Sequence, residues 1–287
     1  MFTFFGIAFG LACTFAGYLL HGGNMMVFVV AWTEYIVIIG AGIGMYLGSN
    51  GMALTKQTIA QIMHLMKPAK FGKQEYEDLL IMIYKLFSLA RTDGLLAIES
   101  HIEEPEKSTI LSANKSFMAN HHAVEFFCDT MKILVTGGVQ PHDLADMMEQ
   151  DLDAVHAEEN QVPDALQVSA DGMPAIGIVA CVLGVIITMG HIGGEASEIG
   201  AAIGNALVGT FLGVLIAYVM MSPLVKGLSQ RIRMEGMYLT CIRHAIARGA
   251  RGDPPSSSLE FARRNIDPSV RPTFSEMDKA IKERGKK

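Results

Sequence analysis

The chain has 287 residues, of which 50% are hydrophobic and 18% are charged, with a formal net charge of −6. Soluble domains carry about 25% charged residues, so this composition and the positive mean hydropathy favour a membrane protein. The four cysteines lie far apart without a Cys-x-x-Cys pair, which excludes a cysteine-based zinc site and a disulfide framework.

Four apolar runs are long enough to cross a hydrocarbon core of about 30 Å, which takes roughly 20 helical residues. We expect the spans at 2–20, 33–53, 173–192 and 199–222, and Trp32, a typical interfacial residue, favours a start of the second span near 32. The sequence shows no alternation typical of strands. The predicted fold class is therefore all-α: a polytopic membrane protein with four transmembrane helices and a helical cytoplasmic domain.

Positive charge is confined to two parts of the chain. Nine of the 23 lysines and arginines lie between the second and third spans, fourteen follow the fourth, and the two short links hold none. Because positive loops stay in the cytoplasm, we expect both termini inside. This organisation predicts a transmembrane part at 1–53, a cytoplasmic helical domain at 54–172, a second transmembrane part at 173–222, and a cytoplasmic helix and tail at 223–287.

Apolar residues at helical spacing predict the helices of the cytoplasmic part. They are expected at 74–91, 95–104, 121–135, 141–159 and 224–250. The phrase RGDPPSSS at 251–258 predicts a turn and linker, and a polar tail follows it.

Asp, Glu, Lys, Arg and His are absent from the middle of every predicted span. Glu34 and His191 are expected at the outer ends of the second and third spans. Thr210 is expected to bond to the carbonyl four residues back, as helical threonines commonly do. If this chain moves protons or sodium, the titrating carboxylate must come from a second chain.

Two prolines and two charges stand out in this pattern. Pro174 follows Asp171 at the head of the third span, where a first-turn proline is tolerated and Asp171 can cap the helix. Pro223 ends the fourth span, so we expect both prolines at one membrane depth. Taken alone, Arg91 and Glu99, on either side of Gly94, are two solvated charges.

The sequence has no nucleotide-binding loop, Ser-His-Asp set or metal-ligand cluster. We therefore expect no enzyme activity, no cofactor and no bound metal, and nothing indicates a nucleic-acid partner.

Taken together, these features resemble the MotA family, the larger membrane subunit of the bacterial flagellar stator. The phrases that carry the resemblance run along the whole chain. They are TEYIVIIGAGIGMYLGSNG at 33–51, RTDGLLAIESHIEEP at 91–105, DGMPAIGIVACVLGVIITMG at 171–190, VGTFLGVLIAYVMMSPL at 208–224 and SLEFARRNIDPSVRPTFSEMD at 258–278.

The resemblance implies a multi-pass protein of the bacterial inner membrane, in contact with lipid. It also implies a homopentamer around a dimeric MotB-type partner, whose single span carries the ion-binding aspartate. In this family the cytoplasmic domain pushes on the rotor protein FliG. By match to the family's motifs, Arg91 and Glu99 are rotor-contacting charges, and Pro174 and Pro223 couple ion passage to movement. Thr210 and Tyr218 fall on positions that line the ion route.

Cys181 bears on the choice of ion. Sodium-driven relatives carry a threonine at this position, and proton-driven relatives usually carry alanine. A thiol is a poor ligand for a hard cation, so the transported ion is expected to be the proton.

Two alternatives to the stator stay open at this point. One is a proton-driven energiser of outer-membrane processes of the ExbB or TolQ type, although these relatives typically have three spans and lack the tail phrase. The other is a structural membrane scaffold that conducts nothing.

Overall fold

The computed structural model describes residues 2–67, 71–190 and 196–285, and these residues form helices and connecting segments without a strand. Within these ranges, four helices are long and apolar enough to cross a membrane. The predicted fold class, an all-α polytopic membrane protein with a helical domain, is therefore confirmed. The chain divides into two compact units, one of Met1–Pro68 with Glu159–Arg231 and one of Ala69–Glu158 with Ile232–Lys287.

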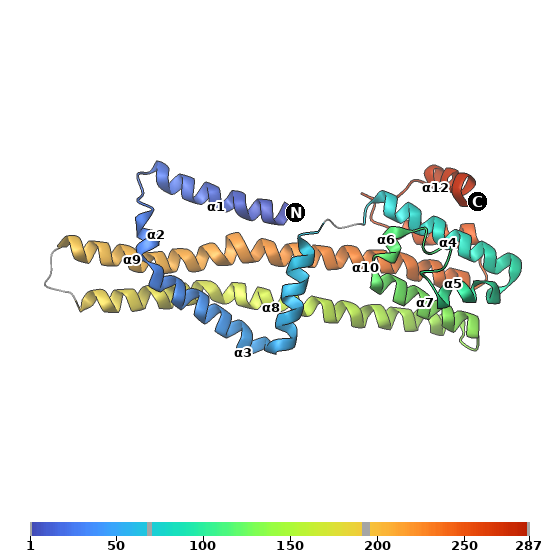
Figure 1. Ribbon diagram of the computed structural model, residues 1–287, viewed down its shortest axis with the longest axis horizontal. Helices are drawn as coiled ribbons and strands as arrows, with labels where there is room; N and C mark the ends of the chain where they lie inside the picture. Colours follow the sequence, from blue (N-terminus) through green and yellow to red (C-terminus); the bar gives the residue numbers. More distant parts are fainter. Residues whose placement is uncertain (1, 68–70, 191–195, 286–287) are drawn as a thin grey trace. The chain divides into compact units, whose positions relative to one another are not determined.

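The first unit holds the apolar helices (Figure 1). Its large hydrophobic side chains lie mostly on the outside, with Phe2 91% and Ile186 61% exposed. Such a surface is unfavourable in water and suited to lipid. The helices of this unit are α1 (Phe2–Leu20), α2 (Met26–Val30), α3 (Trp32–Leu65), the end of α8 (Pro141–Met189), α9 (Ala196–Leu215), the π-helix η2 (Ile216–Met221) and the start of α10 (Ser222–Ala250).

Helix α3 begins at Trp32 and continues beyond the apolar run to Leu65, with a bend on the way (Figure 1). The bend falls at Gly51, whose φ of 68° lies in the left-handed region. Glycine adopts this conformation without the steric cost that a Cβ would add. A glycine near the end of the apolar run therefore breaks the helix and turns its polar continuation in a new direction.

Helices α8 and α9 run side by side through the first unit and approach each other closely at glycines (Figure 1). A Cβ placed on Gly177 would lie 2.8 Å from the Gly209 carbonyl oxygen and 3.0 Å from the Gly213 Cα. Backbones this close leave no room for a side chain, which is the usual packing device between helices in lipid. By contrast, Gly40, Gly44 and Gly48 of α3 have no atom within 4 Å of such a Cβ.

Helix α8 is longer than predicted. The predicted helix 141–159 and the third span form one continuous helix, Pro141–Met189. Asp171 therefore does not cap a helix. It lies inside α8, where its carboxylate accepts a hydrogen bond from Gln167 at 2.8 Å. Pro174 is likewise an interior proline, and the interpretation of a first-turn proline is wrong. Residues 160–172, between the two predicted segments, continue the helix and join them.

The second unit is built around a core of buried aliphatic and aromatic residues, including Leu79, Ile83, Phe127 and Ile242. Each such side chain contributes roughly 1.5–3 kcal/mol by its removal from water. The elements that supply this core and its flanks are α4 (Lys73–Asp93), η1 (Leu95–Ile98), α5 (Glu99–Glu103), α6 (Lys115–Met118), α7 (His121–Thr136), the remaining parts of α8 and α10, α11 (Pro255–Arg264), α12 (Phe274–Ala280) and η3 (Ile281–Gly285).

The C-terminal tail is ordered and packs on this core, unlike the linker and polar tail that its composition predicts. Pro255 occupies the first turn of α11, where a proline lacks no needed donor. Leu259, Ala262 and Ile266 are buried in the core. The phrase RGDPPSSS thus begins with the predicted turn, where Gly252 has a φ of 82°, but its second half starts α11. The linker part of that prediction is wrong, because prolines and serines suit a helix N-terminus as well as a turn.

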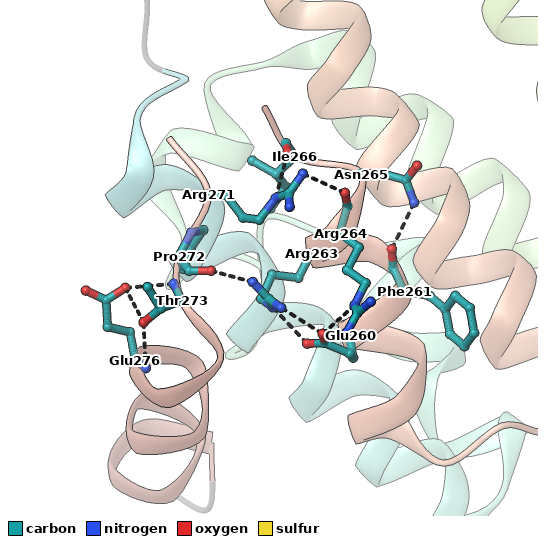
Figure 2. Close-up of polar contacts among 10 residues, drawn as sticks. All are labelled: Glu260, Phe261, Arg263, Arg264, Asn265, Ile266, Arg271, Pro272, Thr273 and Glu276. Carbon is teal, nitrogen blue, oxygen red and sulfur yellow. Dashed lines mark hydrogen bonds and ion pairs between the residues drawn. The ribbon is translucent and has the colours of Figure 1, made fainter. Parts of the chain in front are cut away.

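One buried arginine joins the end of α11 to the start of α12 (Figure 2). Arg263 donates from Nε and Nη2 to the two carboxylate oxygens of Glu260, both at 2.7 Å, and from Nη1 to the Pro272 carbonyl at 2.8 Å. Thr273 and Glu276 form a capping box at α12, and Lys73 of α4 donates to Glu276 at 2.7 Å. These bonds fold the loop between α11 and α12 back onto the domain.

Loss of the Glu260 charge is expected to loosen the tail. Its bonds to Arg263, and then to Arg264, lower the pKa of the Glu260 carboxyl to about 2. Glu260→Gln removes a charge-assisted pair and leaves Arg263 underpaired, a loss of about 1–3 kcal/mol. Limited proteolysis of membranes should then cut 265–273 faster. In wild type the Glu260 contribution is complete above its ordinary pKa of 4.5 and is lost as the pH falls towards 2.

The matched control is Glu283→Gln. Glu283 pairs with Lys279 at 3.9 Å in an exposed position, so its loss should leave cleavage unchanged. Equal cleavage rates in the Glu260 and Glu283 variants would contradict the assigned role of this arginine cluster.

Candidate functional site

The residues that the sequence proposes for an ion route lie on α8, α9 and η2 of the first unit. Cys181 and Thr210 are half-buried, and Tyr218 is 63% exposed. The backbone nitrogen of Cys181 lies 3.1 Å from a Cβ placed on Gly209. Cys181 and Thr210 therefore occupy one layer of the α8–α9 pair, whereas Tyr218 lies two helical turns beyond it.

This layer lies midway along the apolar part of α8. Cys181 comes eight residues after Met173 and eight before Met189 (181 − 173 and 189 − 181). The same layer crosses α9 at Gly209. The Cys181–Thr210 layer therefore lies near the middle of the apolar stretch of α8.

The two prolines lie at different depths, so the expectation of a common depth is wrong. A Cβ on Gly213 would lie 2.7 Å from the Met173 carbonyl, which puts Pro174 level with Gly213. Leu224, next to Pro223, packs instead against the cluster of Leu65, Val162 and Leu228. Pro223 comes ten residues after Gly213, roughly 15 Å along the axis at about 1.5 Å per residue. The antiparallel register of α8 and α9 sets this offset, and span ends alone do not reveal it.

Pro223 is preceded by a stretch of π-helix that the sequence did not indicate. In η2 the Ser222 amide donates to the Ala217 carbonyl, five residues back. A proline inside an α-helix clashes with the carbonyl four residues before it and removes a hydrogen bond, at about 3 kcal/mol or more. The wider turn of η2 is how the helix makes room for Pro223, and π-helical turns often mark functional positions.

Pro174 interrupts α8 without such a turn. Because it has no N–H, the Ala170 carbonyl loses its normal helical donor. Helix α8, and the continuation of α9 through η2 into α10, therefore each carry an interruption of the backbone hydrogen bonds, and helices bend most easily at such places.

The Thr210 hydroxyl differs from those of Thr14 and Thr188. Thr14 donates to the Gly10 carbonyl at 2.8 Å and Thr188 to the Gly184 carbonyl at 2.9 Å. Among the residues that the structure describes, the Thr210 hydroxyl makes no such bond, so its predicted bond to the carbonyl four residues back is wrong. A free hydroxyl in the Cys181–Thr210 layer is available to a partner or a water.

Glu34 is a site residue whose burial the sequence did not indicate. It lies in the first turn of α3, at the outer end of the second span as expected. Its side chain is only 9% exposed, however, and its carboxylate reaches Gly184 of α8 and Gly209 of α9. His191, the other outer-end residue in that expectation, lies outside the described residues.

Arg91 and Glu99 lie in the second unit, on either side of a sharp turn. Arg91 is in the last turn of α4 and Glu99 starts α5, and Gly94 ends α4 with a φ of 91°. Both charged side chains are exposed, and neither has an ion-pair partner within 2–67, 71–190 and 196–285. Leu95 and Leu96 between them are 42% and 74% exposed. The turn thus presents two free charges and two apolar side chains.

Comparison with known proteins identifies relatives over almost the whole chain. The family described as "Motility protein A N-terminal" matches residues 4–94, and the "MotA/TolQ/ExbB proton channel family" matches residues 118–240. Motility protein A of Escherichia coli (strain K12) is 32% identical over 98% of this chain and 95% of its own length. Chemotaxis protein LafT of Vibrio parahaemolyticus is 30% identical over 99% of both.

Solved structures share the fold. A structure of C. jejuni MotAB matches with a TM-score of 0.77 at 21% identity, over 93% of this chain and 97% of the other. The flagellar MotAB stator complex from Bacillus subtilis matches with a TM-score of 0.78 at 20% identity, over 96% and 100%. The predicted family is confirmed: this chain is a membrane protein that belongs to the motility protein A family, within the MotA/TolQ/ExbB proton channels.

Proposed function

We propose that this chain is the ion-conducting stator subunit of a bacterial flagellar motor, which couples proton flow to torque on the rotor. The observation that carries the proposal is the α8–α9 pair, in which two apolar helices touch through glycine and each has an interrupted backbone. Its Cys181–Thr210 layer offers a free hydroxyl midway along the pair. The match of the first third of the chain to a motility-specific family disfavours the ExbB or TolQ alternative.

The ion path needs a titrating group from a second chain, which we propose to be a MotB-type subunit with an aspartate in its single span. A charged carboxylate in lipid is costly, so its protonation changes which neighbours it prefers. One elementary charge that falls through 100 mV releases about 2.3 kcal/mol. The transported ion is the proton, because Cys181 offers a thiol where a hard cation prefers oxygen.

Pro174 and Pro223 convert this change into movement. Helices rotate or bend most easily where a hydrogen bond is missing, and these prolines interrupt the pair at two depths. Tyr218, exposed on η2 between them, lies on the same route. The free energy released by one ion, a few kcal/mol, is enough to shift the α8–α9 pair between two arrangements.

Arg91 and Glu99 are proposed to meet the rotor protein FliG. Free charges of both signs beside exposed Leu95 and Leu96 suit a contact that forms and breaks repeatedly. The complex is a homopentamer around a dimeric partner in the bacterial inner membrane. Both termini face the cytoplasm, because the lysines and arginines lie in the second unit and beside it. No cofactor or enzyme activity is part of this mechanism.

Deletion of the chromosomal copy should give cells that carry flagella but do not swim, and a plasmid copy should restore swimming. Plasmids with Pro174→Ala or Pro223→Ala should not restore it, because an uninterrupted helix resists bending. Pro163→Ala is the matched control, since Pro163 also lies inside α8 but away from the ion layer. Swimming is tracked in soft agar and assembly by co-purification with the partner.

Motile deletion cells would reject the stator function, and normal swimming in both proline variants would reject coupling through prolines.

Charge reversal should separate rotor contact from ion conduction. Arg91→Glu and Glu99→Lys should each slow or stop swimming, because they invert the contact with the rotor, while proton uptake by vesicles stays at the wild-type rate. Lys107→Glu is the control, since Lys107 pairs with Glu104 on an exposed surface elsewhere. If the reversed variants swim like the Lys107 variant, these residues do not meet the rotor.

A further inference from the structure

Glu34 is the one acidic residue in the four apolar stretches 2–20, 32–53, 172–190 and 199–222. Its side chain does not face outward to lipid or to the membrane surface. It is 9% exposed, and a Cβ placed on Gly209 would lie 3.0 Å from its Oε2, while one on Gly184 would lie 3.6 Å from its Oε1. The carboxylate fits between α8 and α9 because both helices have glycine there.

The Oε2 atom of Glu34 is buried and has no hydrogen-bond partner among the residues that the structure describes. An isolated buried carboxylate costs many kcal/mol in its charged form, and it commonly takes up a proton instead. The stretches 172–190 of α8 and 199–215 of α9, which lie beside it, contain no Asp, Glu, Lys, Arg or His. A proton therefore neutralises this group without any counter-charge.

The position of Glu34 ties it to the ion route. A Cβ on Gly209 would touch both the Glu34 carboxylate and the Cys181 backbone nitrogen. Gly209 directly precedes Thr210, whose hydroxyl is free. The carboxylate thus lies at the depth of the Cys181–Thr210 layer, reached through the glycine gap between the two helices.

We propose that Glu34 is a second proton-binding site of the stator, which exchanges protons with the partner's aspartate through the gap at Gly184 and Gly209. The Glu34 carboxylate takes up one proton from the outer side and becomes a neutral acid. It then passes this proton to the partner's carboxylate and returns to the charged form. This inference rests on the proposed function, and it adds a titrating group of this chain to the one expected from the partner.

The test compares proton flux in vesicles that contain the complete complex. Glu34→Gln keeps the shape and polarity of the side chain but cannot release a proton, so flux should fall at least about tenfold while the partner still co-purifies. Glu34→Asp keeps the carboxyl and should retain part of the flux. Wild-type flux in the Glu34→Gln complex would overturn the proposal.

A second measurement holds even if the glutamine variant fails to assemble. A hydrophobic carbodiimide, which reacts with protonated carboxyl groups, is applied to the wild-type complex, and modified peptides are found by mass spectrometry. Modification of Glu34 that declines as the pH is raised supports the proposal, and an unmodified Glu34 at low pH overturns it. If the wild-type complex conducts no protons at all, the proposed function fails, and the labelling still decides whether Glu34 binds a proton.

Discussion

The contact between α8 and α9 is the constraint on which the rest of the membrane unit depends. In lipid, apolar side chains gain little by packing on each other, so helices associate where their backbones approach closely. Gly177, Gly209 and Gly213 provide that approach. The same glycines fix the register of the two helices, and the register decides which groups share a depth. The Cys181–Thr210 layer and the place of Glu34 both follow from it.

The two helices pack closely, yet the backbone hydrogen bonds along them are interrupted, and this combination suits a part that moves. Pro174 removes a backbone hydrogen bond from α8, and the π-helix η2 accommodates Pro223 in the following helix. Each interruption costs a few kcal/mol in an ordinary helix. That is comparable with the energy that one ion delivers across the membrane, so a change in charge beside the pair is large enough to alter its geometry.

The fold class and the helices of the second unit were predictable, because hydrophobic runs and helical spacing report on them directly. The predictions that failed concern contacts between helices. The burial of Glu34 follows from its contact with α8 and α9, and the offset between Pro174 and Pro223 follows from an antiparallel register. Neither is a property of one segment. The ordered tail was missed for another reason: Arg263 and its partners Glu260 and Pro272 stabilise it through bonds that composition does not reveal. The roles of Arg91, Glu99, Thr210 and Tyr218 rested on the family resemblance, since each has an ordinary alternative in a single sequence.

The central claim is that this chain forms a proton path only together with a partner that brings an aspartate. The direct measurement is proton flux into vesicles under an imposed potential, with the chain alone and with its MotB-type partner, at several sodium concentrations. The account predicts flux that requires the partner and does not change with sodium. Flux that depends on sodium, or a partner-containing complex that conducts nothing, would contradict it.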